Sequence, residues 1–308
     1  MLTPPAIQPG DRVRVVAPSG PFDRGRLERG LAVLERYELK IELDPEIFST
    51  HRYLAGPDPR RLAELQAALD DPGVSLIWAA RGGYGATRLL PHLRLEGALQ
   101  APKVLAGFSD ITALHALLNK AGLPTLHAPV VCGLGESSPE TLDQLRRVLE
   151  GHDPGPLRWA PARTLTPGKA EGPLLGGNLS VLTRLIGTPY LPDLSGAILF
   201  LEDVGERPYR LDRMLTHLEL AGLHRGLAGV LLGQFTGCEE RGAEYGWEEV
   251  VAEQIASWGV PAVMGVPSGH GAPNLPLALG APVSLDADRA TLRWAGPVFA
   301  RQTPPGAT

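Results

Sequence analysis

The first half of the chain alternates short apolar runs with stretches in which leucine recurs at helical spacing. Apolar runs at residues 12–17, 74–80 and 103–106 predict buried strands, and the alternation over 39–43 predicts another. Amphipathic helices are predicted between them by leucines three or four positions apart: Leu27, Leu31 and Leu34; Leu62, Leu65 and Leu69; Leu114, Leu117 and Leu118. Strands separated by helices of this length imply an α/β fold with a mostly parallel, doubly wound sheet.

This rhythm is interrupted over residues 152–172, which carry four prolines with glycines among them. Proline cannot continue a helix or lie in a central strand. We therefore predict an N-terminal α/β domain over 1–151, a Pro/Gly-rich linker over 152–172 and a second α/β domain over 173–308.

The pattern resumes in the second half. It predicts helices at 179–186, 211–220 and 247–258, strands at 197–201, 229–235 and 262–266, and a hairpin over 283–294. The second half therefore repeats the α/β alternation and ends in antiparallel strands.

Length and composition narrow the class of protein. The chain has 308 residues, 44% of them hydrophobic, which is enough for a substantial core and favours two domains. The formal net charge of -5 gives no basic surface for nucleic acid. The first residues lack a signal-peptide pattern, and no apolar run approaches the length of a membrane span. We expect a soluble cytoplasmic protein without a membrane or nucleic-acid partner.

Cys132 and Cys238 are the only cysteines, and they lie far apart without histidines at metal spacing. This argues against a disulfide framework and against a zinc site. We expect neither a metal nor a cofactor.

Chemistry in an α/β sheet is expected just after the strands, at their carboxyl ends. Polar or glycine-rich segments follow the predicted strands at four places: Arg81–Gly85, Gly107–Thr112, Glu202–Asp203 and Pro267–Gly271. These segments are the candidates for a shared site.

Ser109 lies in the sequence GFSDIT, between a strand and a helix. This order is that of a nucleophile elbow, although Ile111 replaces the last glycine of G-x-S-x-G. The alternative is an ordinary helix cap. In either case the free N–H groups of the helix start, including that of Asp110, could hold an oxyanion.

The loop Gly82-Gly83-Tyr84-Gly85 allows close backbone approach. It is a flexible turn, a phosphate cradle or the source of an oxyanion N–H at Gly83. The dinucleotide fingerprint G-x-G-x-x-G fails because Arg88 stands where the last glycine would be, and no Walker A sequence occurs.

Glu202 and His270 are candidates for the acid and base. Glu202 ends an apolar run, where it is either a surface-bound strand end or a partner that orients an imidazole. His270 lies between two glycines directly after a predicted strand, where packing gives little reason for an imidazole. His127 is interpreted as a core histidine, and His115 should face away from Ser109. A nucleophile, base, acid and oxyanion donors are what a serine hydrolase needs.

Several segments, in this order, resemble the LD-carboxypeptidase family of serine peptidases: APSGP, ARGGYG, GFSDIT, GGNLSVL, LFLEDVGERPYRLDR and PSGHGAPNLPLALG. That family includes muramoyltetrapeptide carboxypeptidases and microcin C immunity peptidases. The resemblance runs from about residue 10 to residue 285. It implies two α/β domains, with the nucleophile in the first and the acid and base in the second, and a homodimer.

Matched by motif, the resemblance implies Ser109 as nucleophile, Glu202 as orienting acid and His270 as base, with the N–H groups of Gly83 and Asp110 as the oxyanion hole. It implies removal of the terminal D-alanine from a murein tetrapeptide in cell-wall recycling. A microcin-immunity-like amidase acting on aminoacyl-nucleotide conjugates is the alternative within this chemistry, and a non-catalytic binding protein is the alternative outside it. Arg81, Tyr84 and Glu206 are further candidates for substrate contacts.

Overall fold

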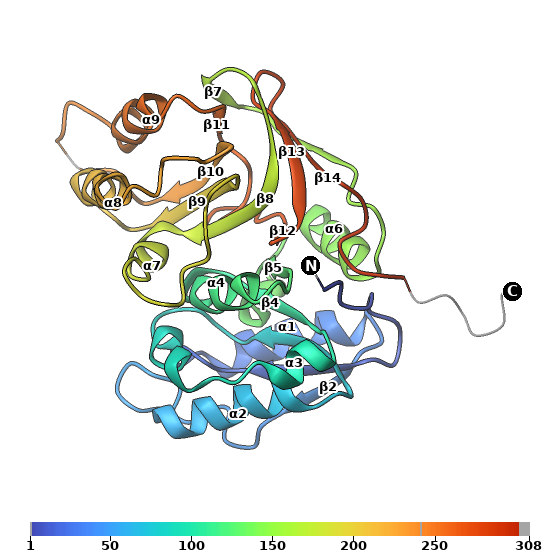
Figure 1. Ribbon diagram of the computed structural model, residues 1–308. Coiled ribbons are helices and arrows are strands. Elements are labelled where there is room, and N and C mark those ends of the chain that lie inside the picture. The colour runs from blue at the N-terminus through green and yellow to red at the C-terminus, as the bar shows by residue number, and fades with distance from the viewer. Residues whose placement is uncertain (1, 241, 302–308) are drawn as a thin grey trace, which may run out of the picture.

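The structure is a computed structural model that describes residues 2–240 and 242–301. Within this described part, the strands form a six-stranded and an eight-stranded sheet. Figure 1 shows the first sheet mainly in blue to green, with one strand from the red end of the chain, and the second sheet in green to red. Helices cover both faces of the first sheet, so the predicted doubly wound α/β fold is confirmed.

The strands of the first sheet are β1 (Arg12–Val16), β2 (Lys40–Leu43), β3 (Val74–Ala79), β4 (Val104–Gly107), β5 (Thr125–His127) and β12 (Leu277–Leu279). Their order across the sheet is β12-β5-β4-β3-β1-β2. All neighbours pair in parallel except β12, which runs antiparallel to β5. The strands predicted in this half are therefore present, and a strand from the far end of the chain joins them.

The helical segments around this sheet are α1 (Arg24–Glu35), α2 (Asp58–Asp70), α3 (Glu96–Gln100), α4 (Thr112–Lys120), α5 (Val131–Leu134), α6 (Pro139–Leu149) and the 3₁₀ turns η1 (Ala86–Arg88), η2 (Leu90–His92) and η3 (Ser109–Ile111). Side chains along β3 alternate between the two faces, as the period of a strand requires. Leu76 and Trp78 join the apolar cluster of α1, α5 and α6, whereas Ile77 and Ala79 join that of α2, α3 and α4.

The strands of the second sheet are β6 (Pro156–Arg158), β7 (Arg163–Thr166), β8 (Lys169–Asn178), β9 (Ile198–Val204), β10 (Gly229–Thr236), β11 (Ala262–Met264), β13 (Pro282–Asp286) and β14 (Thr291–Trp294). Their order is β6-β14-β13-β8-β9-β10-β11-β7, with β8 to β11 parallel. The predicted hairpin is present as β13 and β14. One face is covered by α7 (Leu179–Thr183), α8 (Pro208–Leu220) and α9 (Trp247–Ser257).

Two segments differ from the sequence-based expectation. The segment 152–172 is not an unstructured connection, because it supplies both edge strands of the second sheet, β6 and β7, and the first residues of β8. Edge positions tolerate proline because one side of the strand needs no hydrogen-bond partner. Strand β9 also continues past the predicted end at residue 201, since Asp203 pairs with β10 and Glu202 with β8. Glu202 therefore lies inside a strand rather than after it.

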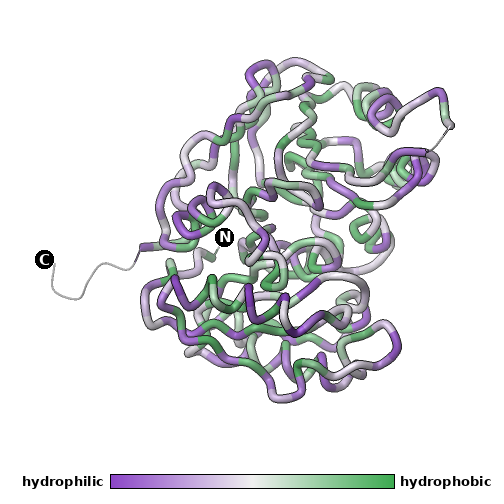
Figure 2. The backbone as a smooth tube through the Cα atoms, turned by 180° about the vertical axis from the view of Figure 1, so that it is seen from behind, coloured by the Kyte–Doolittle hydropathy of each residue, from purple (hydrophilic) through white to green (hydrophobic). Residues whose placement is uncertain are grey.

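The apolar core is continuous across the two sheets. One cluster of buried side chains includes Trp78 and Leu126 of the first sheet and Leu174 and Phe200 of the second. Figure 2 shows hydrophilic residues gathering in the outer loops and hydrophobic ones along the interior strands. The placement of a domain boundary at 152–172 remains a prediction, but the two halves share packed surface.

Candidate active site

Ser109 follows directly on β4, where the chain turns sharply. Gly107 ends the strand with a φ of 154°, and Ser109 has a φ of 65°, a value that non-glycine residues rarely adopt. Such strain is typical of the turn that holds a nucleophile above a sheet. Gly82 lies so close that a Cβ there would come 3.0 Å from Ser109 Oγ. The serine is therefore held against the glycine loop that follows β3.

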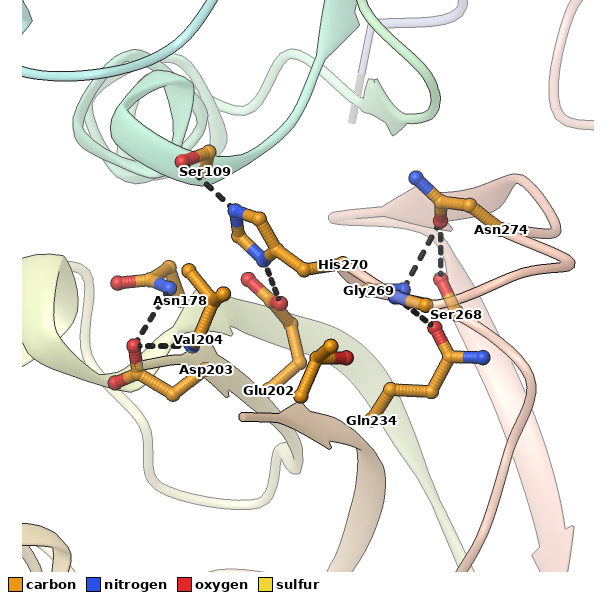
Figure 3. A network of polar contacts seen from close by, with 12 residues as sticks. Ser109, Asn178, Glu202, Asp203, Val204, Gln234, Ser268, Gly269, His270 and Asn274 are labelled. Atoms are coloured by element: carbon orange, nitrogen blue, oxygen red, sulfur yellow. Dashed lines mark hydrogen bonds and ion pairs between the residues drawn. The ribbon is translucent and has the colours of Figure 1, made fainter. Parts of the chain in front are cut away.

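Ser109, His270 and Glu202 form a continuous chain of hydrogen bonds. His270 Nε2 lies 3.1 Å from Ser109 Oγ, and His270 Nδ1 lies 2.6 Å from Glu202 Oε2. Figure 3 shows the imidazole between the hydroxyl and the carboxylate, with the serine carried by the first half of the molecule. Glu202 is fully buried and the His270 side chain is 16% exposed. The structure thus brings together three candidates that are up to 161 positions apart in sequence.

The hydrogen-bond partners assign the tautomer of His270. A carboxylate only accepts hydrogen bonds, so Nδ1, which faces Glu202, carries the proton. Nε2 then has a lone pair directed at the Ser109 hydroxyl, which donates to it. Ser109 therefore does not act as a simple helix cap, because its side chain faces the imidazole.

The loop that carries His270 is held by side chains that the sequence reasoning did not single out. Gly271 N donates to Gln234 Oε1 at 2.8 Å. Gly269 N donates to Asn274 Oδ1 at 3.0 Å (Figure 3). Gly269 has a φ of 136°, and a Cβ there would lie 3.0 Å from Glu202 Oε2. The glycine lets the loop close over Glu202. Asn274 belongs to the motif PSGHGAPNLPLALG. A polar side chain next to the apolar residues of that motif was the one feature of the sequence that could have indicated its role.

A second set of unpredicted contacts links the nucleophile's helix to the strand that carries Glu202. Asn178 N, on β8, donates to Thr112 Oγ1, on α4, at 2.9 Å. Asn178 Nδ2 in turn donates to Asp203 Oδ1 at 3.1 Å. Asp203 is buried, which raises the pKa of its carboxyl, and its oxygens also accept from Ser180 and from the backbone. These bonds fix α4 relative to β9.

The two predicted oxyanion donors lie on adjoining segments beside Ser109. Gly83 has a φ of 110° in the loop after β3, and Asp110 is the next residue after the serine. The Asp110 carboxylate is buried and accepts from Ser19 Oγ at 2.6 Å and from Ala86 N at 2.8 Å. Burial raises the pKa of this carboxyl, and these hydrogen bonds oppose the effect. Asp110 therefore anchors the far end of the glycine loop.

The candidates for substrate contacts occupy different surroundings. Arg81 is exposed and donates to Pro21 O. Tyr84 is 48% exposed, with its ring centroid 5.8 Å from that of Tyr53. Glu206 follows β9 and forms an ion pair with Arg210 at 3.3 Å. Arg81 directly precedes Gly82, which lies against Ser109, and Tyr84 belongs to the same loop, whereas Glu206 is already paired.

The buried histidines His115 and His127 lie beneath the site. His115 Nε2 donates to Gly107 O at 2.9 Å, and burial lowers the pKa of His115 to about 4. His127 packs edge-on against Phe200, with ring centroids 5.0 Å apart. Burial, followed by the charges of His115 and His270, lowers the pKa of His127 well below its ordinary value. His127 is the core histidine that was predicted, and both rings are neutral near pH 7.

Among residues 2–240 and 242–301, no group of three or more His, Cys, Asp or Glu side chains could hold a metal ion. In the same ranges no helix is both long and apolar enough to cross a membrane.

Comparison with known proteins decides the family. Residues 13–128 match the LD-carboxypeptidase N-terminal domain, and residues 171–285 match the LD-carboxypeptidase C-terminal domain. The chain is 41% identical over 301 residues to a putative carboxypeptidase from Streptomyces coelicolor, covering 95% of this chain and 96% of that protein. The chain belongs to the LD-carboxypeptidase family. A murein tetrapeptide carboxypeptidase from Pseudomonas aeruginosa is 38% identical over 304 residues, covering 93% of this chain and 96% of that enzyme.

Solved structures agree with the fold of an LD-carboxypeptidase. The muramoyltetrapeptide carboxypeptidase from Oxalobacter formigenes superposes with a TM-score of 0.83 at 28% identity, covering 92% of this chain and 97% of that one. The microcin C7 self-immunity protein MccF, in complex with aspartyl sulfamoyl adenosine, superposes with a TM-score of 0.89 at 24% identity, covering 97% of this chain and all of the other. The likeness to the latter establishes the shared two-sheet fold.

Proposed function

We propose that the protein is a serine carboxypeptidase that hydrolyses the L,D peptide bond of murein tetrapeptides and releases their terminal D-alanine. The continuous hydrogen-bonded chain from Ser109 through His270 to Glu202 carries this proposal. The murein substrate is supported by the relative from Pseudomonas aeruginosa, which is named for that activity. A retained fold without catalysis would give no reason for a strained serine to face a histidine that is itself paired with a buried carboxylate.

In this mechanism His270 Nε2 accepts the proton of Ser109 as Oγ attacks the carbonyl carbon of the scissile bond. Glu202 holds the imidazole through Nδ1 and stabilises the imidazolium that forms. The N–H groups of Gly83 and Asp110 donate to the tetrahedral oxyanion. His270 then gives the proton to the leaving D-alanine amine, and water, activated by the same imidazole, hydrolyses the acyl-enzyme.

The substrate contacts are proposed from the structure, and the location and oligomeric state from the family resemblance. We infer that Arg81 and Tyr84 contact the peptide, because both lie within two positions of Gly82, which is held against Ser109. Glu206 contributes only if the substrate displaces its ion pair with Arg210. The enzyme acts in the cytoplasm on peptides from cell-wall recycling, as a homodimer, without cofactor, metal, nucleic-acid or membrane partner.

The proposal is tested by D-alanine release from a murein tetrapeptide, comparing the wild type with Ser109→Ala at equal concentration. Circular dichroism establishes that both proteins are folded. Release by the wild type alone is the expected result, with a loss of at least about 10³-fold in kcat for the variant. Equal release by both proteins overturns Ser109 as the nucleophile.

Release by neither folded protein overturns the murein substrate. The same pair is then assayed on an aminoacyl sulfamoyl adenosine, the class of ligand named for the solved MccF structure. Hydrolysis by the wild type alone identifies the immunity-like amidase. Saturable binding without turnover identifies a binding protein of the same fold.

A further inference from the structure

The loop that bears the proposed oxyanion donor Gly83 consists mostly of glycine, so it has almost no side chains that could fix its conformation. Residues 82, 83 and 85 are glycines, and Gly83 and Gly85 have φ values of 110° and 137°. Glycine loses more conformational freedom on ordering than any other residue. A donor positioned to within a few tenths of an ångström therefore requires anchors from outside the loop.

Three backbone groups of this loop are anchored by other segments. Gly82 O accepts from Gly20 N at 3.0 Å, and Ala86 N donates to the Asp110 carboxylate at 2.8 Å. Gly85 O accepts from Arg61 Nη1 at 3.0 Å. The last of these anchors is a charged side chain of α2, which neither the motifs nor the mechanism uses.

Arg61 is fully buried, which is rare for arginine unless the group is paired. Its Nη1 also donates to Pro18 O, and its Nη2 donates to Asp58. One guanidinium therefore joins the loop after β3 to the loop after β1. A Cβ at Gly85 would lie 2.6 Å from Arg61 Nη1, so the close approach depends on glycine at position 85.

The positive charge of Arg61 is balanced by the Asp58 carboxylate, which also holds the segment after the glycine loop. The Asp58 carboxylate binds Arg61 and also Arg88, whose Nε lies 2.8 Å from Asp58 Oδ2. Arg88 ends η1, the turn that directly follows the glycine loop. The Arg88 and Arg61 guanidinium groups hold the pKa of Asp58 below its ordinary value. The Asp58 carboxylate thus links the Arg61 guanidinium, which binds the glycine loop, to η1, which follows that loop.

We propose that Arg61 is a positioning residue of the oxyanion hole, which fixes the Gly83 N–H by holding the carbonyl groups of Gly85 and Pro18. This inference rests on the proposed mechanism. Arg61 does not touch the substrate, since its guanidinium is fully buried behind the loop. Its effect is therefore transmitted through the backbone to the donor.

Loss of Arg61 should lower kcat, because the oxyanion donor acts in the transition state. An oxyanion donor stabilises charge that develops in the transition state, and its removal typically costs about 10²- to 10³-fold in kcat. Loosening the loop displaces the donor without removing it, so we expect a loss of about 10- to 100-fold. KM should change little, because the ground-state carbonyl carries little of this charge.

The test measures the rate at which a fluorophosphonate labels Ser109. Oγ forms a bond to phosphorus, fluoride leaves, His270 takes the hydroxyl proton, and the phosphoryl oxygen needs the same donors as the peptide oxyanion. Arg61→Met is compared with Arg60→Met. Arg60 is a matched control because its side chain is 7% exposed and ion-paired, but it binds Ala55 O and Glu64 rather than the glycine loop.

Labelling of Arg61→Met at about one tenth to one hundredth of the Arg60→Met rate is the expected result, with kcat for D-alanine release falling in parallel. Arg61→Lys should recover part of the rate, because an ammonium can still donate to Pro18 O or Gly85 O. Equal labelling rates for Arg61→Met and Arg60→Met overturn the inference. If Arg61→Met does not fold, Arg61→Lys is compared with Arg60→Lys: slower labelling of Arg61→Lys is then the expected result, and equal rates overturn the inference.

The probe also separates this inference from the proposed substrate. Labelling that depends on Arg61, together with no D-alanine release by the wild type, overturns the murein substrate and leaves the positioning role intact. Failure of the folded wild type to be labelled, with Ser109→Ala as the baseline, overturns the nucleophile and this inference with it.

Discussion

At the scale of single residues, the site is defined by Ser109, Glu202 and His270. Ser109 has a φ of 65°, Glu202 is fully buried, and His270 lies in a loop closed by a glycine with a φ of 136°. The conformation of Ser109 and the burial of the Glu202 carboxylate each cost free energy by themselves, whereas glycine adopts a positive φ without strain. The mutual hydrogen bonds offset that cost only when all three groups are present. The motifs GFSDIT, LED and PSGHG predicted these residues, but only the folded chain brings their side chains within hydrogen-bond distance.

Replacing Glu202 by glutamine should lower kcat by about 10³- to 10⁴-fold. The amide of glutamine can donate to Nδ1, which favours the tautomer that leaves Nε2 protonated and unable to accept from Ser109. Steady-state D-alanine release measures the effect. Glu219→Gln is the control, because the Glu219 carboxylate accepts from Trp258 on the outer face of the second sheet. Similar rates for the two variants would contradict the role of Glu202.

The pKa of His115 predicts how stability depends on pH. Burial lowers the pKa of His115 from 6.5 to about 4 in the folded state. Between pH 6.5 and pH 4 the unfolded chain therefore binds more protons, and the free energy of unfolding falls as the pH falls. His127 shifts in the same direction and contributes to the same loss.

The variant His115→Gln isolates one of these two groups. Its amide can still donate to Gly107 O, but it does not titrate. Urea unfolding at pH 7 and pH 4.5 should show the wild type losing about 2 kcal/mol more stability than the variant. Equal losses for both proteins would show that burial does not lower the pKa of His115 in the folded state.

At the scale of elements, the contact between α4 and β8 aligns the nucleophile with the acid and base. Gly177 permits this contact, because a Cβ there would lie 2.5 Å from Thr112 Oγ1. Asn178 then bonds Thr112 on one side and Asp203, next to Glu202, on the other. Gly176, Gly177 and Asn178 directly precede a helix that the sequence predicts. The hydrogen bond from Asn178 to Thr112 on α4 could not be predicted, because the two residues are 66 positions apart.

Gly177→Ala should therefore reduce catalysis by more than its effect on stability explains. Its φ of 134° makes alanine cost of order 1–3 kcal/mol, and the clash moves α4 away from β8. We expect kcat and Ser109 labelling to fall at least about 10-fold in the folded variant. Gly222→Ala is the control, since it has a φ of 74° and open space around the new methyl group. Equal activity in the two folded variants would rule out alignment by this contact.

At the scale of the whole molecule, the two sheets behave as parts of one packed body. Strand β12 comes from the C-terminal half but pairs with β5 of the first sheet, and one apolar cluster spans both sheets. The segment 152–172 supplies edge strands instead of a free hinge. This continuity fixes the distance between Ser109 and His270, since a hydrogen bond of 3.1 Å does not survive relative motion of separate domains.

The proposed homodimer is a prediction at this same scale. Size-exclusion chromatography with light scattering should give twice the 32.8 kDa of the chain at micromolar concentration. Ser109→Ala should give the same mass, because its hydroxyl contacts His270 within the chain. A mass of one chain for the wild type would overturn the dimer without affecting the catalytic proposal.

The sequence by itself determined most of the longer helices and buried strands, their alternation and the identity of the chemical groups. Local periodicity reports which face of an element is buried, and the motif residues lie in or next to the apolar runs, so both are readable over a few positions. The tertiary structure decided everything that depends on pairing between distant segments. It decided that β12 crosses to the first sheet, that residues 152–172 form edge strands, and that Arg61 anchors the glycine loop. A hydrogen bond between groups tens of residues apart leaves no periodic trace in the sequence, because it depends on how the whole chain packs.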